Sequence, residues 1–190
     1  MDLTPFGELW EKFAGGTPRR IELLSFEAAG IDPLKAKGLG EMSIVDHAVA
    51  RSRLISGAGH ILKVTGRYKL HNPEALFKQV ADAPNLDIIC GFRHKLNWAD
   101  SRVFVVRPRF IPDFLAPLTS LIDDQDVWFE HVFAKAVHSA IAAGWQWDLP
   151  ADWLDLEGVA GTKGTRMRQP FFRRLCSLAM HKVRHFAYER

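Results

Sequence analysis

Short apolar runs alternate with helical stretches along the first half of the chain, and this alternation constrains the fold more than any other feature of the sequence. Residues 20–26 ("RIELLSF") and 60–70 ("HILKVTGRYKL") have the composition of buried strands. Between them, residues 41–54 carry apolar side chains at helical spacing, and Asn72 and Pro73 mark the start of the next helix. The pattern predicts an α/β fold with a mostly parallel sheet and flanking helices, whose ligands lie beyond the carboxyl ends of the strands.

The second half of the chain adds two strand-like runs, "NLDIICGF" and "SRVFVVRPRF", a helical stretch over residues 111–121, and a strongly amphipathic helix that begins with "DDQDVWFEHVF". A chain of 190 residues is long enough for one substantial core. We therefore expect one α/β domain over residues 1–165, followed by a basic helix over residues 166–190 that packs on the domain or extends from it.

The charge and the cysteine content indicate which cellular compartment and which kind of partner to expect. The net charge is +3, and the tail from Lys163 to Arg190 holds much of the basic excess, which is typical of contact with an anionic partner. Cys90 and Cys176 lie far apart, so neither a disulfide framework nor a zinc site is indicated. The first residues lack the pattern of a signal peptide, and no apolar run approaches the ~20 residues of a membrane span. We expect a cytoplasmic protein, with peripheral contact at the inner face of the cell membrane left open.

The motif "KGLGE" places Lys37, Gly38 and Gly40 directly before a predicted helix that begins at Glu41. Exposed backbone N–H groups, the positive end of the helix dipole and a nearby ammonium group together suit an anion such as a diphosphate. The spacing matches neither the P-loop nor the dinucleotide-binding fingerprint. A loop that is closed by a helix start is the alternative interpretation.

Polar residues end the strand-like run "HILKVTGRYKL". Lys63 and Thr65 offer an ammonium group and a hydroxyl group, and Gly66 allows a ligand to approach the backbone closely. Arg67 can hold a phosphate or a carboxylate in its guanidinium fork, and Tyr68 can stack or donate a hydrogen bond. The alternative is an edge turn with a solvated arginine.

The acidic residues of "DDQDVWFEHVF" are the candidate catalytic bases. Asp124, Asp126 and Glu130 are expected at the start of a helix, where negative side chains also complement the dipole, so that a helix cap is the alternative for the aspartates. Glu130 shares the predicted helix face of Asp126 and lies beside aromatic residues, which would raise its pKa and suit it to general-base catalysis. His131 is an alternative base.

Three further residues are candidates for acceptor binding. Asp100 and Arg102 come just before a strand, where a local ion pair is the alternative to a substrate contact. Lys163 lies in the glycine-rich loop "GVAGTKGT", which suits closure over an anion or an ordinary turn.

The basic helix that follows could rest on an anionic membrane surface or bind nucleic acid, with an ordinary docked helix as the alternative.

Five motifs together carry a resemblance to a known group of proteins. In chain order, "KGLGEMSIVDHAV", "HILKVTGRYKLHN", "ADSRVFVVRPRF", "DDQDVWFEHVF" and "GVAGTKGT" resemble bacterial glycosyltransferase-like proteins of surface-polysaccharide and lipopolysaccharide biosynthesis. The resemblance spans residues 21–165 and is most specific in the Lys-Gly-x-Gly-Glu and Thr-Gly-Arg-Tyr elements. It implies a variant of the GT-A nucleotide-diphosphosugar transferase fold.

The resemblance also implies roles for the matching residues. In the GT-A family the strand that corresponds to "HILKV" ends in an Asp-x-Asp motif, which holds a divalent metal on the diphosphate of the donor. Thr65, Gly66 and Arg67 take that place here, so the guanidinium would supply the charge of the metal, or Mn or Mg would be held elsewhere. No metal ligand is assigned. The catalytic acidic residue of the family lies at a helix start late in the fold, which matches the acidic residues of "DDQDVWFEHVF".

The start of the chain departs from the family pattern. GT-A folds begin with a strand, a helix and a second strand, whereas the helix-like "PFGELWEKF" opens this chain and residues 20–26 would be the second strand. We therefore expect an N-terminally truncated GT-A-like fold, with an inactive relative as the alternative to an active enzyme.

The leading hypothesis is a glycosyltransferase that moves a sugar from a nucleotide-diphosphosugar to a saccharide or lipid-linked acceptor in cell-surface polysaccharide synthesis. Lys37, the "GLG" backbone and Arg67 would bind the diphosphate, and Glu130 or Asp126 would deprotonate the acceptor hydroxyl. Nucleic acid is not an expected partner of this enzyme. The alternative is a non-catalytic α/β protein whose basic C-terminal helix binds nucleic acid or anionic lipid.

Overall fold

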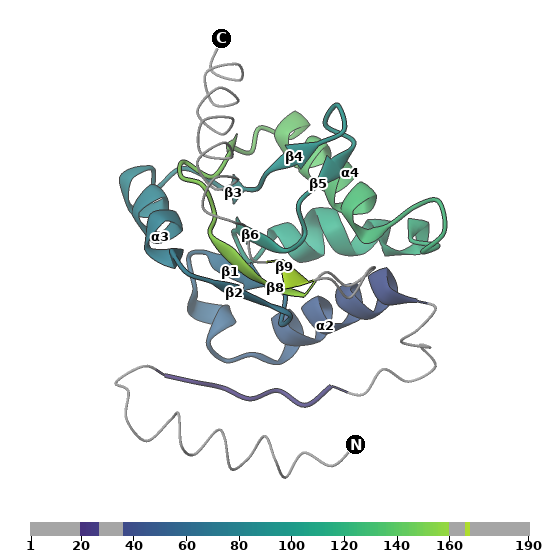
Figure 1. Cartoon of the computed structure of the whole chain (residues 1–190), viewed down its shortest axis with the longest axis horizontal. Coiled ribbons are helices and arrows are strands. Elements are labelled where there is room, and N and C mark those ends of the chain that lie inside the picture. The colour runs from purple at the N-terminus through teal and green to yellow at the C-terminus, as the bar shows by residue number, and fades with distance from the viewer. Residues whose placement is uncertain (1–19, 27–35, 160–165, 168–190) are drawn as a thin grey trace.

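The computed structural model of the chain describes residues 20–26, 36–159 and 166–167, and Figure 1 shows how their elements are arranged. Helices lie on both faces of a four-stranded sheet. In chain order the elements are α2 (Lys37–Arg51), η1 (Ile55–Gly57), β1 (Ile61–Val64), β2 (Tyr68–Leu70), α3 (Pro73–Asp82), β3 (Ile88–Ile89), β4 (Phe92–Arg93), β5 (Trp98–Ala99), β6 (Val103–Val106), η2 (Ile111–Leu115), η3 (Ala116–Leu121), α4 (Phe129–Ala142), β7 (Trp147–Asp148), β8 (Leu156–Val159) and β9 (Arg166–Met167).

The main sheet is mixed and mostly antiparallel, so the predicted mostly parallel sheet is wrong. Its strand order is β1-β6-β3-β7. Strand β6 runs antiparallel to both β1 and β3, and only β3 and β7 are paired in parallel among the described strands of this sheet. The hairpin β4–β5, rather than a helix, joins β3 to β6, and a chain that returns without a crossover runs antiparallel. The α/β class is confirmed.

The two faces of the sheet pack against different helices. Phe104 and Val106 of β6 share one core with α2 and α4, and the ring centroid of Phe104 lies 4.5 Å from that of Phe133 in α4. Val103 and Val105, which alternate with them along the strand, belong to a second core with α3. Strand β6 is therefore buried on both faces, which explains its continuously apolar sequence.

The run "HILKVTGRYKL" forms two strands rather than one. Strand β1 ends at Val64, and the chain turns through residues 65–67 before β2 begins. The N–H of Tyr68 donates to the carbonyl of Thr65 and closes this turn at 2.9 Å. Strand β2 then pairs with β8 in a separate three-stranded sheet. The polar residues of the motif thus occupy the turn between two sheets.

Residues 20–26 do not form the predicted strand within the described part of the chain. Figure 1 shows this segment in purple, lying apart from the main sheet on the far side of α2. The carboxylate of Glu22 accepts a hydrogen bond from the Ser52 hydroxyl at 2.6 Å and from the N–H of Arg53. The Phe26 ring lies 5.3 Å from that of His47. Side-chain contacts with α2 and the residues after it, rather than strand pairing, therefore hold the segment.

Two of the long helices begin at other residues than the sequence predicts. Helix α2 already begins at Lys37, so that "KGLG" forms its first turn instead of a loop before it. Helix α4 begins only at Phe129, and the aspartates of "DDQDV" lie in the loop that precedes it. The predicted start of α3 is confirmed, with Pro73 as its first residue.

Some sequence-based predictions fall outside the described residues. They are the helix at residues 5–13, Lys163 and most of the basic helix predicted over residues 166–190. Arg166–Met167 is described and forms strand β9, so the helix does not begin at residue 166. None of the helices in the described segments has both the length and the apolar run needed to cross a membrane.

Candidate active site

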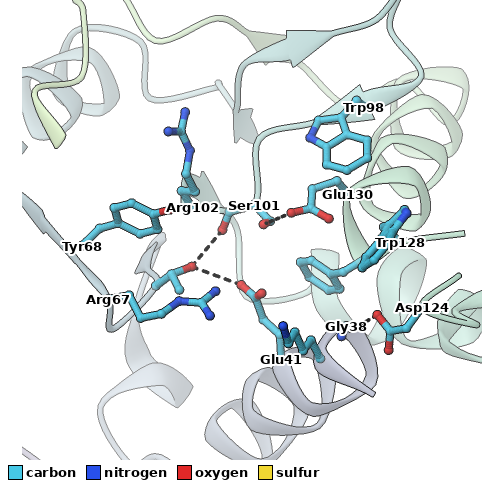
Figure 2. Close-up of a pocket in the computed structure, with 13 residues that line it drawn as sticks. Gly38, Glu41, Arg67, Tyr68, Trp98, Ser101, Arg102, Asp124, Trp128 and Glu130 are labelled. Carbon is cyan, nitrogen blue, oxygen red and sulfur yellow. Dashed lines mark hydrogen bonds between the residues drawn. The ribbon is translucent and has the colours of Figure 1, made fainter. Parts of the chain in front are cut away.

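A pocket of about 390 Å³ lies where the first turn of α2, the turn after β1, strand β5 and the start of α4 meet (Figure 2). It brings together three motifs that are far apart in the sequence, "KGLGE", "VTGRYKL" and "DDQDVWFEHVF". Its lining residues are Lys37, Gly38, Glu41, Thr65, Arg67, Tyr68, Trp98, Ser101, Arg102, Asp124, Trp128, Phe129 and Glu130.

Two cationic side chains of the pocket have no acidic partner among the described residues. Lys37 begins α2, and Arg67 lies in the turn between β1 and β2; both are exposed. The ion pairs of the described part of the chain involve neither of them. An ammonium group and a guanidinium group that face one pocket without a counterion favour an anionic ligand.

The positive end of α2 is already occupied by a side chain of the protein itself. The Asp124 carboxylate accepts hydrogen bonds from the N–H groups of Gly38 and Leu39, with N to O distances of 2.7 and 3.3 Å. These N–H groups have no partner inside the helix, and a carboxylate there also complements the dipole. The anion site predicted from "KGLGE" is therefore present, but Asp124 fills it and acts as a cap of α2.

A partly buried lysine, Lys63, lies next to the pocket but does not line it. The Lys63 ammonium group pairs with the Glu41 carboxylate and donates to the Thr65 hydroxyl at 2.7 Å and to the Ser101 carbonyl at 2.5 Å. It also lies 5.5 Å from the ring centroid of Phe104. Burial lowers the pKa of Lys63, and the neighbouring carboxylate opposes that effect. Lys63 is thus held inside the protein and does not line the predicted donor site.

Glu130 has the surroundings of a general base. It lies in the first turn of α4, lines the pocket and accepts a hydrogen bond from the Ser101 hydroxyl at 2.9 Å. Burial raises the pKa of Glu130 above its ordinary value, and the nearby carboxylates of Glu41 and Asp100 raise it further, while its hydrogen bonds act in the opposite direction. A carboxylate with a raised pKa is a stronger proton acceptor when it is ionised.

Asp100 and Arg102 form the local ion pair that the sequence left as an alternative. The Arg102 guanidinium donates to both carboxylate oxygens of Asp100, at 2.8 and 2.5 Å, and lies 5.8 Å from the ring centroid of Tyr68. Burial alone would raise the pKa of Asp100, but the hydrogen bonds and the charge of Arg102, together with Arg93, lower it below its ordinary value. Arg102 lines the pocket, whereas Asp100 supports it from behind.

Other predicted residues lie away from the pocket lining. Gly40 is inside α2, where its N–H donates to Ala36, and Gly66 is exposed in the turn after β1. Asp126 is exposed in the loop before α4 and does not share a helix face with Glu130. The ring Nδ1 of His131 accepts a hydrogen bond from the N–H of Trp128 at 3.1 Å, so His131 caps α4.

Four lining residues were missed by the sequence analysis. Ser101 and Trp98 belong to "NWADSR", where only the charged residues Asp100 and Arg102 were considered as candidates. Trp128 and Phe129 were expected only as the apolar environment of Glu130. The signal that could have found Trp98 is a large aromatic residue in a short polar segment between two strands, because loops between strands often carry binding residues.

A divalent metal does not fit the side chains of the described part of the chain. Among the described residues, no group of three or more His, Cys, Asp or Glu side chains could hold a metal ion. Of the pocket carboxylates, Glu41 pairs with Lys63 and Asp124 caps α2, while the turn after β1 offers no carboxylate. The side chains of the turn after β1 therefore suit an anion better than a metal ion.

Comparison with protein-family models, curated proteins and solved structures finds no match to the chain, so these comparisons assign no family to it.

Proposed function

We propose that the pocket binds a nucleotide-diphosphosugar and transfers its sugar to a hydroxyl group of a saccharide or lipid-linked acceptor. One observation supports the proposal above all others: Lys37 and Arg67 face the same pocket as Glu130, whose pKa is raised by burial. Cations for a leaving diphosphate and a base for an incoming hydroxyl are the two requirements of this transfer.

The cationic side chains of the pocket would bind the diphosphate of the donor. In the transfer the bond between the anomeric carbon and the diphosphate oxygen breaks, and the bonding electrons leave with the diphosphate. Arg67 would hold two of its oxygens through the guanidinium fork, and Lys37 would add a second positive charge. A GT-A-like variant fold for the domain belongs to the same proposal.

The Glu130 carboxylate would activate the acceptor. Ionised Glu130 takes the proton of the acceptor hydroxyl as its oxygen forms the new bond to the anomeric carbon. The Ser101 hydroxyl fixes one carboxylate oxygen of Glu130 and leaves the other for the acceptor (Figure 2). A lipid-linked acceptor would place the reaction at the cytoplasmic face of the cell membrane.

Isothermal titration with UDP, GDP and CDP tests the donor part of the proposal. We expect saturable binding of at least one nucleotide, and a loss of about tenfold or more in affinity for Arg67→Ala. The matched control is Arg109→Ala, because Arg109 is 82% exposed, pairs with Asp113 and lies outside the pocket. A folded protein that binds none of the three nucleotides, or binds them equally well without Arg67, would contradict the proposal.

A further inference from the structure

The hairpin β4–β5 carries Trp98 into the pocket through an uncommon turn. His94, Lys95 and Leu96 follow one another with φ values of 50, 56 and 70°. Residues with a side chain rarely adopt this left-handed region, and three in succession persist only where the surrounding structure holds them. Such backbone is concentrated at functional sites, so the position that this turn gives to Trp98 needs an explanation.

The rest of the hairpin is fastened to α4. The Phe92 ring stacks on His138 with 5.1 Å between ring centroids. The same His138 forms a hydrogen bond through Nε2 with the carbonyl of Leu96, inside the turn, at 3.0 Å. One residue of α4 thus holds both the first strand of the hairpin and its turn, and the second strand is placed rigidly as a consequence.

Trp98 itself is in contact with two imidazole rings. The His131 ring lies 4.8 Å from the indole at an interplanar angle of 81°, and the His94 ring lies 6.0 Å away at 79°. His131 is fixed in turn, because its Nδ1 accepts the N–H of Trp128 at the start of α4. The indole therefore enters the pocket as a preorganised surface rather than as a mobile side chain.

The indole of Trp98 and the guanidinium of Arg67 lie on different sides of the pocket. Figure 2 shows Trp98 next to the Glu130 carboxylate, while Arg67 lies on the other side of Ser101 and Glu41. A group that rests on Trp98 therefore lies beside the base and away from the guanidinium. In the proposed transfer, that group is the acceptor and not the diphosphate.

We propose that the indole of Trp98 is a stacking platform for a pyranose ring of the acceptor, which makes the acceptor terminus a sugar and presents one of its hydroxyl groups to Glu130. This assignment rests on the proposed function. The axial C–H bonds of a pyranose form an apolar face that packs on the negative face of an aromatic ring, while the hydroxyl groups at its rim remain free for polar partners. An indole beside a hydrogen-bonded carboxylate matches both surfaces.

Saturation-transfer NMR with methyl glycosides of glucose, galactose and N-acetylglucosamine tests the platform on the full chain. We expect transfer to the ring protons of at least one glycoside, a weakening of about tenfold for Trp98→Ala, and substantial retention for Trp98→Phe. Trp153→Phe is the control, since Trp153 is half-buried and does not line the pocket. Circular dichroism confirms that each variant is folded.

The outcomes separate the platform from the proposed function. Equal glycoside binding by the wild type and Trp98→Ala, or no binding by the wild type, would overturn the platform even if UDP binds through Arg67. Loss of nucleotide affinity in Trp98→Ala would also overturn it, because the indole would then hold the base of the donor. Glycoside binding that depends on Trp98, without any nucleotide binding, would support Trp98 as part of a sugar site and contradict the proposed transferase function.

Discussion

The carboxylate of Asp124 accepts a hydrogen bond from the backbone N–H of Gly38, with 2.7 Å between the nitrogen and Oδ1. This bond joins the loop before α4 to the first turn of α2 and closes one end of the pocket. An anionic ligand that reached the α2 terminus would have to displace a carboxylate that belongs to the protein. Such a ligand would instead meet the side chains of Lys37 and Arg67, whereas Arg102, the other cation of the described lining, is paired with Asp100.

Replacing Gly38 by alanine should destabilise the protein although alanine favours helices. A Cβ at this position would lie 2.6 Å from Oδ1 of Asp124 and 3.2 Å from the backbone nitrogen of Phe129. We expect a loss of about 1–2 kcal/mol in the free energy of unfolding, because overpacking outweighs the gain in helix propensity. Urea denaturation measures it.

The control for this variant is Gly57→Ala. Among the described residues other than its two chain neighbours, no atom lies within 4 Å of a Cβ added at Gly57, so we expect a change of less than about 0.5 kcal/mol. Equal effects of the two substitutions would show that the protein accommodates the added Cβ without displacing Asp124.

The partly buried pair of Lys63 and Glu41 should couple strongly. Lys63→Met leaves the Glu41 carboxylate and the Ser101 carbonyl without their cationic donor, so we expect a loss of about 3 kcal/mol. The double variant Lys63→Met/Glu41→Gln should lose clearly less than the sum of the two single variants. A double-mutant cycle by chemical denaturation measures the coupling, and strictly additive losses would contradict it.

The sequence predicted the contents of the site better than the fold that holds it. Three separate motifs do meet at one pocket, and the turn after Val64 is the structure that the sequence offered as the alternative for "VTGRYKL". The direction of β6 was missed, because the strand pattern is the same in both directions and only the connection through the hairpin decides it. Local periodicity carries no information on such pairing.

Tertiary partners account for the remaining errors within the site. Lys63 was expected to face a ligand, but its partner Glu41 lies on α2, and only the packing of α2 on β1 brings the two together. The start of α2 was placed too late because its cap is Asp124, 86 residues further along the chain. Trp98 was missed because its turn contains no glycine to mark the left-handed backbone.

Asp100 should contribute stability that is lost in acid. Burial acts to raise its pKa, but Arg102 and Arg93 hold the pKa below the ordinary value of 3.8. The contribution is therefore present above pH 3.8 and disappears as the pH falls through the lowered pKa. At neutral pH we expect Asp100→Asn to cost about 2 kcal/mol, since it leaves Arg102 half-buried without its carboxylate.

The cost of Asp100→Asn should shrink progressively when denaturation curves are repeated at decreasing pH. The control is Asp82→Asn, because Asp82 pairs with Lys78 at the surface, with 63% of its side chain exposed, and such pairs stabilise little. A cost of Asp100→Asn that stays constant to the lowest pH would show that the charge of Asp100 is not the cause.

Glu130 should have the opposite dependence on pH. Burial raises the pKa of Glu130 above the ordinary value of 4.5, so the folded state binds its proton more tightly than the unfolded state does. Stability from this group is complete below pH 4.5 and is lost as the pH rises through the raised pKa. We therefore expect Glu130→Gln to raise the free energy of unfolding at neutral pH, because it removes a buried charge and keeps an oxygen that accepts the Ser101 hydroxyl.

The gain from Glu130→Gln should vanish below pH 4.5, where the wild-type side chain is neutral as well. Glu74→Gln is the control, since Glu74 is exposed in the first turn of α3. The same amide cannot take a proton from an acceptor hydroxyl, so the proposed sugar transfer should be abolished in a variant that is more stable than the wild type. Stability lost at neutral pH, or a gain that grows in acid, would mean that the charge of Glu130 stabilises the folded protein instead of destabilising it.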